Sequence, residues 1–439
     1  MFSLRTSTPP PTMLVFRFDF EYKTRTKVHP GDNYAKAAVT MGDPEPICSG
    51  KDPTQCDLTN HTDIATFLRY TDSERILIVI IIPIILVIGV CANMTFIFVV
   101  LRLRHMHTVT NYYLLNLAIS DVSFLSLAVG DKLALYLESP MVDDQRVLGP
   151  WGCTLLYYTT NICFLASMFL ITAVMAEKFY AVCKPLHHRV ASGIRRTVRT
   201  LVIVWIVALL FAFLLIPSHA VYNDYQIIWP DEDVYSVFPL DVGKCEPVRS
   251  MAANYIANGI QTIPFFTVMV VNFYMNVRIV RALTERMRAH PGSIAANERL
   301  HGIINARNQR TRNQVVRMLV INGVVFFCLL SPFQIFSLYR MIEGLVTDTT
   351  SNIAIRTRQL VWAFRILSYI NPAVNPFIYT LSNKRYRRAF FLAIPCLKRL
   401  CLQHRNPDRA ALAGTVHVSL EESKNKNQES HSENSTRSS

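Results

Sequence analysis

The sequence predicts an all-α membrane protein, a seven-transmembrane helix bundle with a short amphipathic eighth helix, and three observations predict this class. The chain of 439 residues is 51% hydrophobic and only 17% charged, whereas an ordinary soluble domain carries about 25% charged residues. The apolar residues gather in segments long enough to cross a bilayer. The net charge of +14 is concentrated in alternate connections between those segments. This composition excludes a disordered chain, a collagen-like chain and a small disulfide scaffold.

The apolar segments are almost free of charge. A spanning helix needs about 20 predominantly apolar residues. Only the second and seventh segments contain charged residues, Asp121 and Arg365. Internal prolines are tolerated in such segments because neighbouring helices re-satisfy the freed carbonyls. In chain order the expected spans are Ile76–Leu101, Asn111–Gly130, Trp151–Ala176, Thr200–Ser218, Ser250–Val277, Met318–Tyr339 and Gln359–Asn383.

The connections between the spans alternate in charge, which sets the expected orientation. The 1–2, 3–4 and 5–6 connections and the segment after the last span are rich in Lys and Arg, whereas the 2–3 and 4–5 connections are acidic. The positive-inside rule then places the N-terminus outside and the C-terminus in the cytoplasm. The basic residues face membrane lipids, so nucleic acid is not an expected partner. The acidic run Asp231-Glu232-Asp233 is either a solvated loop or an electrostatic guide for a cationic peptide.

Polar tails flank the spans, and their composition predicts disorder. Cys396 and Cys401 follow a short basic amphipathic stretch, which suits S-palmitoylation; unmodified surface thiols are an equally good interpretation. The expected segments are a disordered extracellular tail over residues 1–75, the seven-helix domain over 76–383, the amphipathic helix over 384–400 and a disordered cytoplasmic tail over 401–439.

Several cysteines and one sequon lie on the expected outer side. Cys153 begins the third span, and Cys245 lies in the 4–5 connection. Both face the oxidising compartment, so we expect them to form a disulfide. Cys48 and Cys56 would close a small second loop, and whether they pair is left open. Asn60 begins an Asn-His-Thr sequon and is an expected glycosylation site.

Short motifs lie at characteristic places in every span. They are Gly89-x-x-x-Asn93, Asn116-Leu117-Ala118-x-Ser120-Asp121, Trp151-x-Cys153, Glu177-Lys178-Phe179 with Pro185-Leu186, Trp205, Pro264, Phe326 with Pro332, and Asn375-Pro376-Phe377-Ile378-Tyr379. Together they resemble the rhodopsin-like (class A) G-protein-coupled receptors over roughly residues 76–400. The seventh span, from Arg365 to Pro376, is similar to thyrotropin-releasing-hormone receptors and related neuropeptide receptors.

The resemblance implies a cell-surface receptor without enzymatic activity, and the spans contain no nucleophile–base pair that would suggest catalysis. It implies a multi-pass plasma-membrane protein that binds an extracellular peptide and activates a heterotrimeric G protein. The tail residues Ser419, Ser423, Ser430, Ser432, Ser435 and Thr436 are either phosphorylation sites for receptor kinases that recruit arrestin or part of a plain disordered tail. Helix six would swing outward around Pro332. The residues implied for activation and coupling are Glu177, Lys178, Phe179, Pro332, Asn375, Pro376 and Tyr379.

The chain departs from the family pattern at several positions. Lys178 replaces an arginine that switches from its carboxylate neighbour to the G protein, and lysine cannot copy a planar guanidinium. Leu330 replaces a tryptophan, and Asn272 replaces a tyrosine. Asn161 and Leu165 stand where thyrotropin-releasing-hormone receptors use a Tyr and an Asn, so that tripeptide is not the expected agonist. Whether Lys178 and Leu330 impair coupling is left open.

Asp121 is the strongest single candidate site. A carboxylate near the middle of the bilayer is costly and is by default functional. Oxygen ligands around one carboxylate suit a hard cation, and the resemblance implies Na⁺ bound in the inactive state, the only cofactor expected. The alternative is a water-filled polar network that joins helices. The side chains expected to face Asp121 are Asn93, Ser167, Asn371 and Asn375.

Arg365 is the second candidate site. It lies about two to three helical turns outward of Asn375, where a guanidinium can fork onto a carbonyl or carboxylate of a peptide. The alternative is an internal salt bridge to a loop acid such as Asp231 or Glu232. Ligand sites combine mostly apolar walls with a few polar anchors. The expected ligand-binding residues are Lys132, Tyr157, Asn161, Phe164, Gln334, Arg365 and Tyr369.

Three other interpretations compete with a peptide receptor. A transporter or channel predicts inverted repeats and broken helices, which the sequence does not contain. Lys178 and Leu330 could mark an atypical, decoy or arrestin-biased receptor. A receptor for a non-peptide ligand would favour a lipid, because an amine receptor of this family carries an aspartate where this chain has Thr160 and Asn161.

Overall fold

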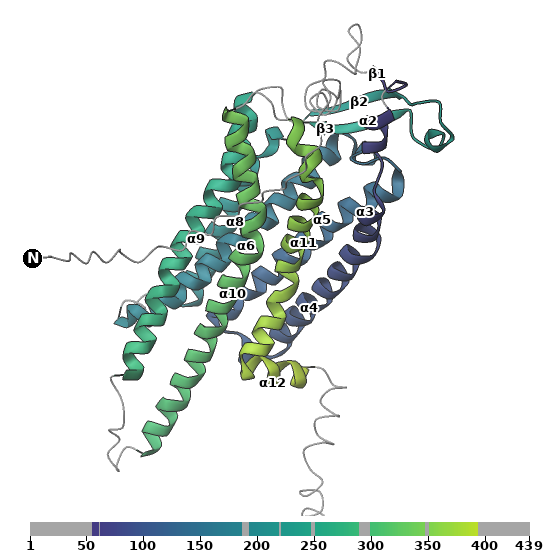
Figure 1. Ribbon diagram of the computed structural model, residues 1–439. Coiled ribbons are helices and arrows are strands. Elements are labelled where there is room, and N and C mark those ends of the chain that lie inside the picture. Colours follow the sequence, from purple (N-terminus) through teal and green to yellow (C-terminus); the bar gives the residue numbers. More distant parts are fainter. Residues whose placement is uncertain are drawn as a thin grey trace, which may run out of the picture.

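Figure 1 shows the computed structural model, in which long helices lie side by side in a bundle. A small β-sheet lies at one end of the bundle and the short helix α12 at the other, and we call these the sheet end and the α12 end. The structure describes residues 55–60, 62–186, 193–218, 221–246, 251–288, 299–346 and 351–393. Three expected modification or disulfide positions, Cys48, Cys396 and Cys401, lie outside these ranges.

Seven long helical rods form the bundle within the described residues. The first is composite, because α3 (Asp72–Ile76), a π-helical turn (Leu77–Ile81) and α4 (Ile82–Arg102) follow one another directly. The wide turn precedes Pro83, whose missing N–H interrupts the regular ladder of hydrogen bonds. The other six rods are α5 (Val109–Glu138), α6 (Gly149–Cys183), α8 (Ile194–Phe213), α9 (Met251–Arg288), α10 (Arg299–Val346) and α11 (Ser351–Ser382).

Short elements connect the rods. The amphipathic helix α12 begins at Lys384, as the sequence predicts, and is described as far as Ala393. Its Tyr386 hydroxyl donates to Asn111 Oδ1 on α5, which fixes α12 against the bundle. The 3₁₀ turns are Arg104–Met106, Arg146–Leu148, Ile216–Ser218 and Asp233–Tyr235, and a short helix α2 covers Thr62–Phe67.

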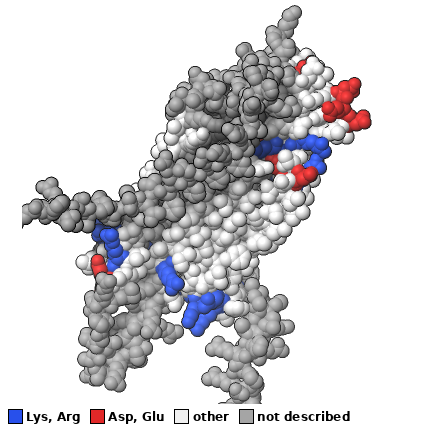
Figure 2. Space-filling view, viewed as in Figure 1, with Lys and Arg blue, Asp and Glu red and all other residues white. Residues whose placement is uncertain are grey.

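The predicted fold class is confirmed. In the described part of the chain, six helical rods are long and apolar enough to cross a membrane. The seventh, α11, is long enough but less apolar, since Arg365, Asn371 and Asn375 interrupt its apolar residues. It packs against α4, α5 and α10 as a full member of the bundle. Figure 2 shows a broad uncharged band between a mixed group of acidic and basic side chains at the sheet end and mostly basic side chains near the α12 end, which is the pattern of a membrane-embedded surface.

The rods approach one another closely at Gly89. A Cβ atom at this position would lie 2.5 Å from Leu125 Cδ1 and 3.0 Å from Ala373 Cβ. The missing side chain therefore lets α4 pack directly against α5 and α11. Asn93 lies four residues further on the same face of α4, so it enters the interior of the bundle.

A three-stranded sheet lies at the sheet end, in the order β1-β2-β3. β1 (Gln55–Asp57) runs parallel to β2 (Val221–Ile228), with Cys56 opposite Ile227. β2 and β3 (Asp241–Glu246) form an antiparallel hairpin from the 4–5 connection, with Tyr222 opposite Cys245.

An apolar cluster, the cap cluster, gives this sheet its own core. The ring centroid of Trp229 lies 5.7 Å from that of Tyr235 and 5.0 Å from that of Phe238. These rings bend the hairpin back on itself and leave its acidic run, Asp231 to Asp233, exposed. The cap cluster consists of Cys56, Leu58, Ala65, Leu68, Met141, Ile227, Trp229, Tyr235, Phe238 and Val242.

The prediction of a disordered tail over residues 1–75 is wrong from residue 55 onward, apart from His61, which is not described. Residues 55–57 form β1, and residues 62–67 form α2. The segment is too short and polar to fold alone, but Leu58, Ala65 and Leu68 are buried in the cap cluster. Their partners lie far away in the sequence, so local composition could not reveal the contact.

The expected disulfide between Cys153 and Cys245 is present, with the two Cα atoms 5.5 Å apart. It joins β3 to the start of α6 and so holds the cap over the bundle. Cys56 is also disulfide-bonded. Asn60 is exposed in a turn after β1, a position that suits a glycosylation acceptor.

Candidate functional site

Asp121 lies in the interior of the bundle and is 2% exposed. Its Oδ1 accepts a hydrogen bond from Ser167 Oγ at 3.0 Å, and its Oδ2 accepts one from Asn375 Nδ2 at 2.6 Å. Ser167 also lies 3.0 Å from Ser120 Oγ, which donates to the carbonyl of Cys163. The carboxylate therefore joins α5, α6 and α11, and two of its four expected neighbours are in place.

The other two expected neighbours are engaged differently. Asn93 Nδ2 donates to the carbonyls of Gly89 and Pro372, at 2.9 and 3.0 Å, and not to Asp121. The Pro372 carbonyl lacks its helical donor because that donor would be the N–H of Pro376. Within the described residues, Oδ1 of Asn93 and Oδ1 of Asn371 are buried without a hydrogen-bond partner. A carboxylate, a hydroxyl and buried amide oxygens are the donor set that suits a sodium ion.

A second cluster lies towards the sheet end and joins helices α5, α6 and α11 through aromatic rings. The Phe124 ring lies 6.3 Å from Phe164 and 6.4 Å from Tyr369. The Tyr369 hydroxyl is 3.5 Å from the carbonyl of Ala128. Phe164 and Tyr369 are thus brought together as the sequence predicts, with Phe124 between them.

Tyr157 connects this region to the cap. Gln145 Nε2 donates to the Tyr157 hydroxyl at 2.7 Å, and Gln145 Oε1 accepts from the N–H of Cys245 at 2.7 Å. Gln145 is thus a link between the β3 strand and the candidate ligand site that sequence reasoning missed. Asp131 and Arg365 are both among the charged neighbours of the Tyr157 hydroxyl.

Arg365 lies beside Trp362, with its guanidinium carbon 5.4 Å from the indole centroid. The ion pairs formed among the described residues do not include Arg365. Asp231 and Glu232, the acids of the alternative interpretation, are exposed at the hairpin turn instead. The internal salt bridge is therefore absent from the described structure, and no described carboxylate lies within ion-pair distance of Arg365.

Lys132 pairs with its own neighbour Asp131, at 2.8 Å from Nζ to Oδ2. Asp131 is 8% exposed, and its second oxygen has no hydrogen-bond partner among the described residues. Sequence reasoning missed Asp131 because the expected second span ended at Gly130, whereas α5 continues to Glu138. A second intramembrane carboxylate would have been visible if the span had been extended by one turn.

The two remaining expected ligand residues, Asn161 and Gln334, are not hydrogen-bonded to Phe124, Phe164 or Tyr369 among the described residues. Asn161 Nδ2 donates to the carbonyl of Tyr157 on its own helix at 2.9 Å. Gln334 is almost fully buried on α10, with no hydrogen-bond partner for Oε1 among the described residues. Both side chains keep polar capacity that a ligand or a rearrangement of α10 could use.

Glu177 and Lys178 pair at the α12 end of α6, with Nζ 2.6 Å from Oε2. Phe179 packs against Tyr274 of α9, with ring centroids 6.3 Å apart. Lys178 thus contacts its carboxylate neighbour through one ammonium, where the family pattern has the two-pronged guanidinium of an arginine. Pro332, Pro376 and Tyr379 lie inside α10 and α11, as expected.

Lys178→Arg is expected to raise G-protein activation up to roughly tenfold, because a second charge-assisted hydrogen bond is worth about 1.5 kcal/mol. The measurement is nucleotide exchange on purified G protein at matched receptor density. Lys184→Arg, an exposed lysine at the same end of α6, is the matched control. An unchanged rate would mean that Lys178 already suffices for coupling.

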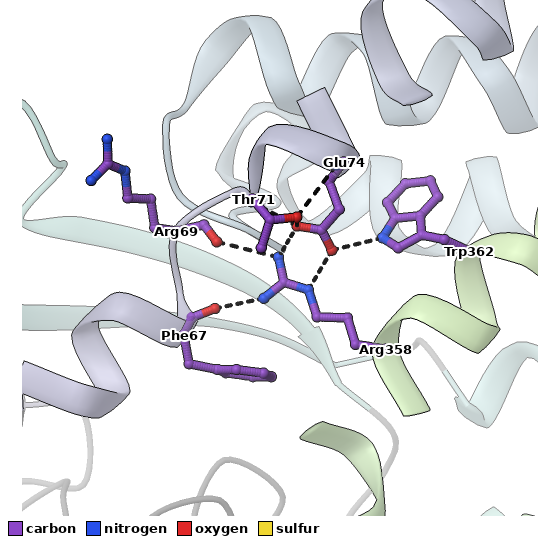
Figure 3. A network of polar contacts seen from close by, with 6 residues as sticks. All are labelled: Phe67, Arg69, Thr71, Glu74, Arg358 and Trp362. Atoms are coloured by element: carbon purple, nitrogen blue, oxygen red, sulfur yellow. Dashed lines mark hydrogen bonds and ion pairs between the residues drawn. The ribbon is translucent and has the colours of Figure 1, made fainter. Parts of the chain in front are cut away.

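A third polar cluster lies where α3 meets α11, and the sequence analysis missed it (Figure 3). Arg358 pairs with Glu74, which is 3% exposed, and also donates to the carbonyls of Phe67 and Arg69, at 2.6 and 3.3 Å. Trp362 Nε1 donates to Glu74 Oε1 at 2.9 Å. Thr71 and Glu74 form a capping box, a local signal that could have located Glu74.

Tyr70 packs beside this cluster. Its ring centroid lies 5.1 Å from that of Tyr136 on α5. Burial, and then the nearby Asp143 and Glu74 carboxylates, raise the pKa of Tyr70 well above its ordinary value. The phenol therefore stays neutral and contributes packing rather than charge to the mouth of the bundle.

These features define a class of protein: a seven-helix membrane receptor with a polar centre in mid-bundle and a capped mouth. The family model described as the seven-transmembrane receptor (rhodopsin family) matches residues 92–379. The chain belongs to the rhodopsin family of seven-transmembrane receptors. Membership makes it a multi-pass plasma-membrane receptor with a G protein as partner, and not an enzyme.

Curated relatives share most of the chain's length. Neuromedin-U receptor 1 of Rattus norvegicus is 28% identical over 73% of this chain and 73% of its own. The thyrotropin-releasing hormone receptor of Gallus gallus is 26% identical over 80% of this chain and 86% of its own. Neuromedin-U receptor 1 of Homo sapiens is 28% identical over 85% of this chain and 86% of its own. The chain is thus similar to class A neuropeptide receptors, as its sequence motifs predict.

Proposed function

We propose that the protein is a receptor for an extracellular neuropeptide and that the receptor, once bound, activates a heterotrimeric G protein. The sheet end faces outward and the α12 end faces the cytoplasm, in agreement with the charge pattern of the connections. The peptide enters under the cap and reaches the cluster formed by Tyr157, Phe164 and Tyr369. Tail serines and threonines, which lie outside the described residues, are the sites for receptor kinases and arrestin.

The observation that carries this proposal is that Arg365 forms no ion pair among the described residues. A buried or half-buried cation without a partner is costly, so it is retained where a ligand supplies the counter-charge. Asp131 lies in the same region, with one oxygen engaged by Lys132 and the other without a hydrogen-bond partner among the described residues. Arginine and aspartate facing one site suit a ligand with both an anionic or carbonyl group and a cationic group, as a peptide has.

Neuromedin-like peptides are the first candidates for the agonist. The supporting observation is the similarity to neuromedin-U receptors over about three quarters of the chain. The acidic hairpin at residues 231–233 would attract a cationic peptide to the mouth. A lipid ligand is the weaker candidate, because neither the acidic hairpin nor Asp131 favours a lipid.

Activation is proposed as a population shift between two packings of the bundle. Peptide binding favours the packing in which α10 swings outward around Pro332 and the Asn375–Tyr379 segment repacks. Lys178 then leaves Glu177 and contacts the G protein. We further propose that Asp121, Ser167, Asn375, Asn93 and Asn371 hold Na⁺ in the resting packing.

The test is a neuropeptide library screen with calcium and cyclic-AMP readouts, repeated on Arg365→Ala. Loss of one charge-assisted contact costs about 1.5–3 kcal/mol, so the half-maximal concentration of the best peptide should rise roughly ten- to hundredfold. Arg69→Ala, an exposed arginine at the same end, is the matched control. A wild-type response from Arg365→Ala would contradict the assignment of the pocket, and a library without any agonist would contradict the peptide proposal.

A further inference from the structure

A series of contacting side chains runs from the first rod to Arg365, the arginine proposed to bind the ligand. Glu74 on α3 accepts a hydrogen bond from Trp362 Nε1, and the Trp362 ring lies beside the Arg365 guanidinium (Figure 3 shows Glu74, Arg358 and Trp362). Arg358, Trp362 and Arg365 are spaced by four and three residues, so they share one face of α11. Nothing in the proposed function so far uses Glu74, Arg358 or Trp362.

We propose that Glu74 is a positioning residue for peptide recognition, which acts on Arg365 through Trp362. The proposal rests on the proposed role of Arg365 in binding the peptide. Glu74 does not touch the peptide in this scheme; it fixes the indole, and the indole orients the guanidinium that does.

The charge arrangement supports this role. Glu74 is buried, and its carboxylate forms an ion pair with Arg358 on α11. Its Oε2 also accepts hydrogen bonds from Thr71 N and Thr71 Oγ1, at 2.9 and 3.0 Å. A buried carboxylate with these partners has no capacity left to neutralise a second arginine. The Glu74–Arg358 pair therefore places an acid near Arg365 without cancelling the Arg365 charge, which stays available to an anionic or carbonyl group of a peptide.

The geometry of Trp362 supports the transmission step. Trp362 is buried, and its only hydrogen-bond donor on the side chain is the indole N–H, which Glu74 engages. With that donor held, the ring plane is fixed, and a cation beside a tryptophan ring is attracted to it. Because arginine side chains have many rotamers, a fixed aromatic surface reduces the entropy that Arg365 loses when it binds a ligand group.

The same cluster connects Arg365 to the cap. Arg358 donates to two carbonyls of the N-terminal segment, those of Phe67 and Arg69, and lies 5.0 Å above the Phe67 ring. Phe67 is the last residue of α2, which packs in the cap cluster through Ala65. A folded N-terminal segment is therefore part of the structure that orients the Arg365 guanidinium.

The competing explanation is that the cluster only holds α3 against α11. In that case its loss would lower the amount of folded receptor without a specific effect on Arg365. A double-mutant cycle separates the two explanations, because coupling between two residues appears only if one acts through the other.

The first experiment uses the full-length receptor and the most potent peptide of the library screen, with responses scaled to surface receptor. Trp362→Phe retains the Glu74–Arg358 pair and an aromatic ring and removes only the N–H. We expect Trp362→Phe and Glu74→Gln each to raise the half-maximal concentration about three- to thirtyfold. In an Arg365→Ala background each should have less than about a twofold effect. Equal effects in both backgrounds would overturn the proposal.

The second experiment needs no peptide. Phenylglyoxal reacts with arginine guanidinium groups, and mass spectrometry of the purified receptor gives the rate at each site. Glu74→Gln weakens the hold on the Trp362 ring, and Trp362→Phe replaces it by a ring without an N–H. Either change should speed modification of Arg365 at least about threefold, since a mobile guanidinium is more accessible. Arg69, whose guanidinium points away from the cluster in Figure 3, is the internal reference. Asp72→Asn, an exposed acid on the same helix, is the matched control and should change neither rate.

The two experiments distinguish the two proposals. If no peptide in the library activates the receptor but Arg365 modification speeds up in Trp362→Phe, the proposed function fails and the positioning of Arg365 stands. If a peptide acts through Arg365 but its modification rate is the same in the wild type, Glu74→Gln and Trp362→Phe, the positioning proposal is wrong and the proposed function stands.

Discussion

Cys245→Ser is expected to remove most of the receptor from the cell surface and to abolish the peptide response of the remainder. The disulfide to Cys153 spans 92 residues of sequence, and closing a loop of that length stabilises a fold by about 4–5 kcal/mol. This is a large part of the roughly 5–15 kcal/mol that separates folded from unfolded states in typical proteins. Flow cytometry of an N-terminal epitope and agonist dose–response curves measure the two effects.

The loss should reach the ligand site as well as the fold. Without the bridge, β3 is still hydrogen-bonded to Asp144, whose Oδ1 accepts from Gly243 N–H. It is also bonded to Gln145, whose Oε1 accepts from Cys245 N–H and whose Nε2 donates to Tyr157. Movement of β3 therefore withdraws Gln145 from Tyr157, one of the proposed ligand residues. The cap cluster would also lose its fixed position over the mouth of the bundle.

Two controls make the result interpretable. Cys91→Ser changes the same atom at a free cysteine exposed on α4, and should leave surface expression and signalling unchanged. The double variant Cys153→Ser/Cys245→Ser should be no worse than either single variant, because both remove one shared bond. A Cys245→Ser receptor with normal surface level and potency would show that the cap is held without the bridge.

The seven rods could be predicted because a membrane span is a local property of about 20 consecutive residues. The same is true of Asp121, which stands out as a carboxylate within an apolar run. Its partners Ser167 and Asn375 could be proposed because each lies in the middle of its own span, and both contact it. The hydrogen bond from Asn93 to the Pro372 carbonyl could not be predicted, because it depends on the N–H that Pro376 lacks.

The sheet end was predicted less well, because its contacts join segments far apart in the sequence. Gln55 pairs with Gln226 across the β1–β2 register, and a three-residue strand has no detectable pattern by itself. Glu74 had a local signal, the Thr71-x-x-Glu74 capping box, but its partner Arg358 lies on α11. No sequence pattern indicates which arginine of α11 pairs with an acid, as Arg358 does, and which forms no ion pair among the described residues, as is true of Arg365.

Asp121→Asn is expected to make agonist affinity independent of sodium. In the wild type, Na⁺ favours the resting packing, so replacing choline chloride by NaCl at constant ionic strength should weaken agonist binding by about 5- to 150-fold, the usual range of allosteric coupling. Asparagine keeps the size of the side chain and can still bond to Ser167 and Asn375, but it lacks the charge that would attract the cation. The measurement is competition binding of the most potent peptide in the two salts.

The partners of Asp121 give this prediction its internal control. Ser167→Ala removes a hydroxyl 3.0 Å from the carboxylate and should reduce the sodium effect without eliminating it. Thr159→Ala, on the same helix, removes an exposed hydroxyl bonded only to its own helix at Leu155 and should leave the effect intact.

By linkage, a ligand that weakens sodium binding must be weakened by sodium to the same degree, so the agonist and Na⁺ should each lower the affinity of the other by one common factor. If the agonist affinity of the wild-type receptor were equal in the two salts, the Asp121 cluster would only join α5, α6 and α11. A cation that binds both packings equally cannot shift the equilibrium between them.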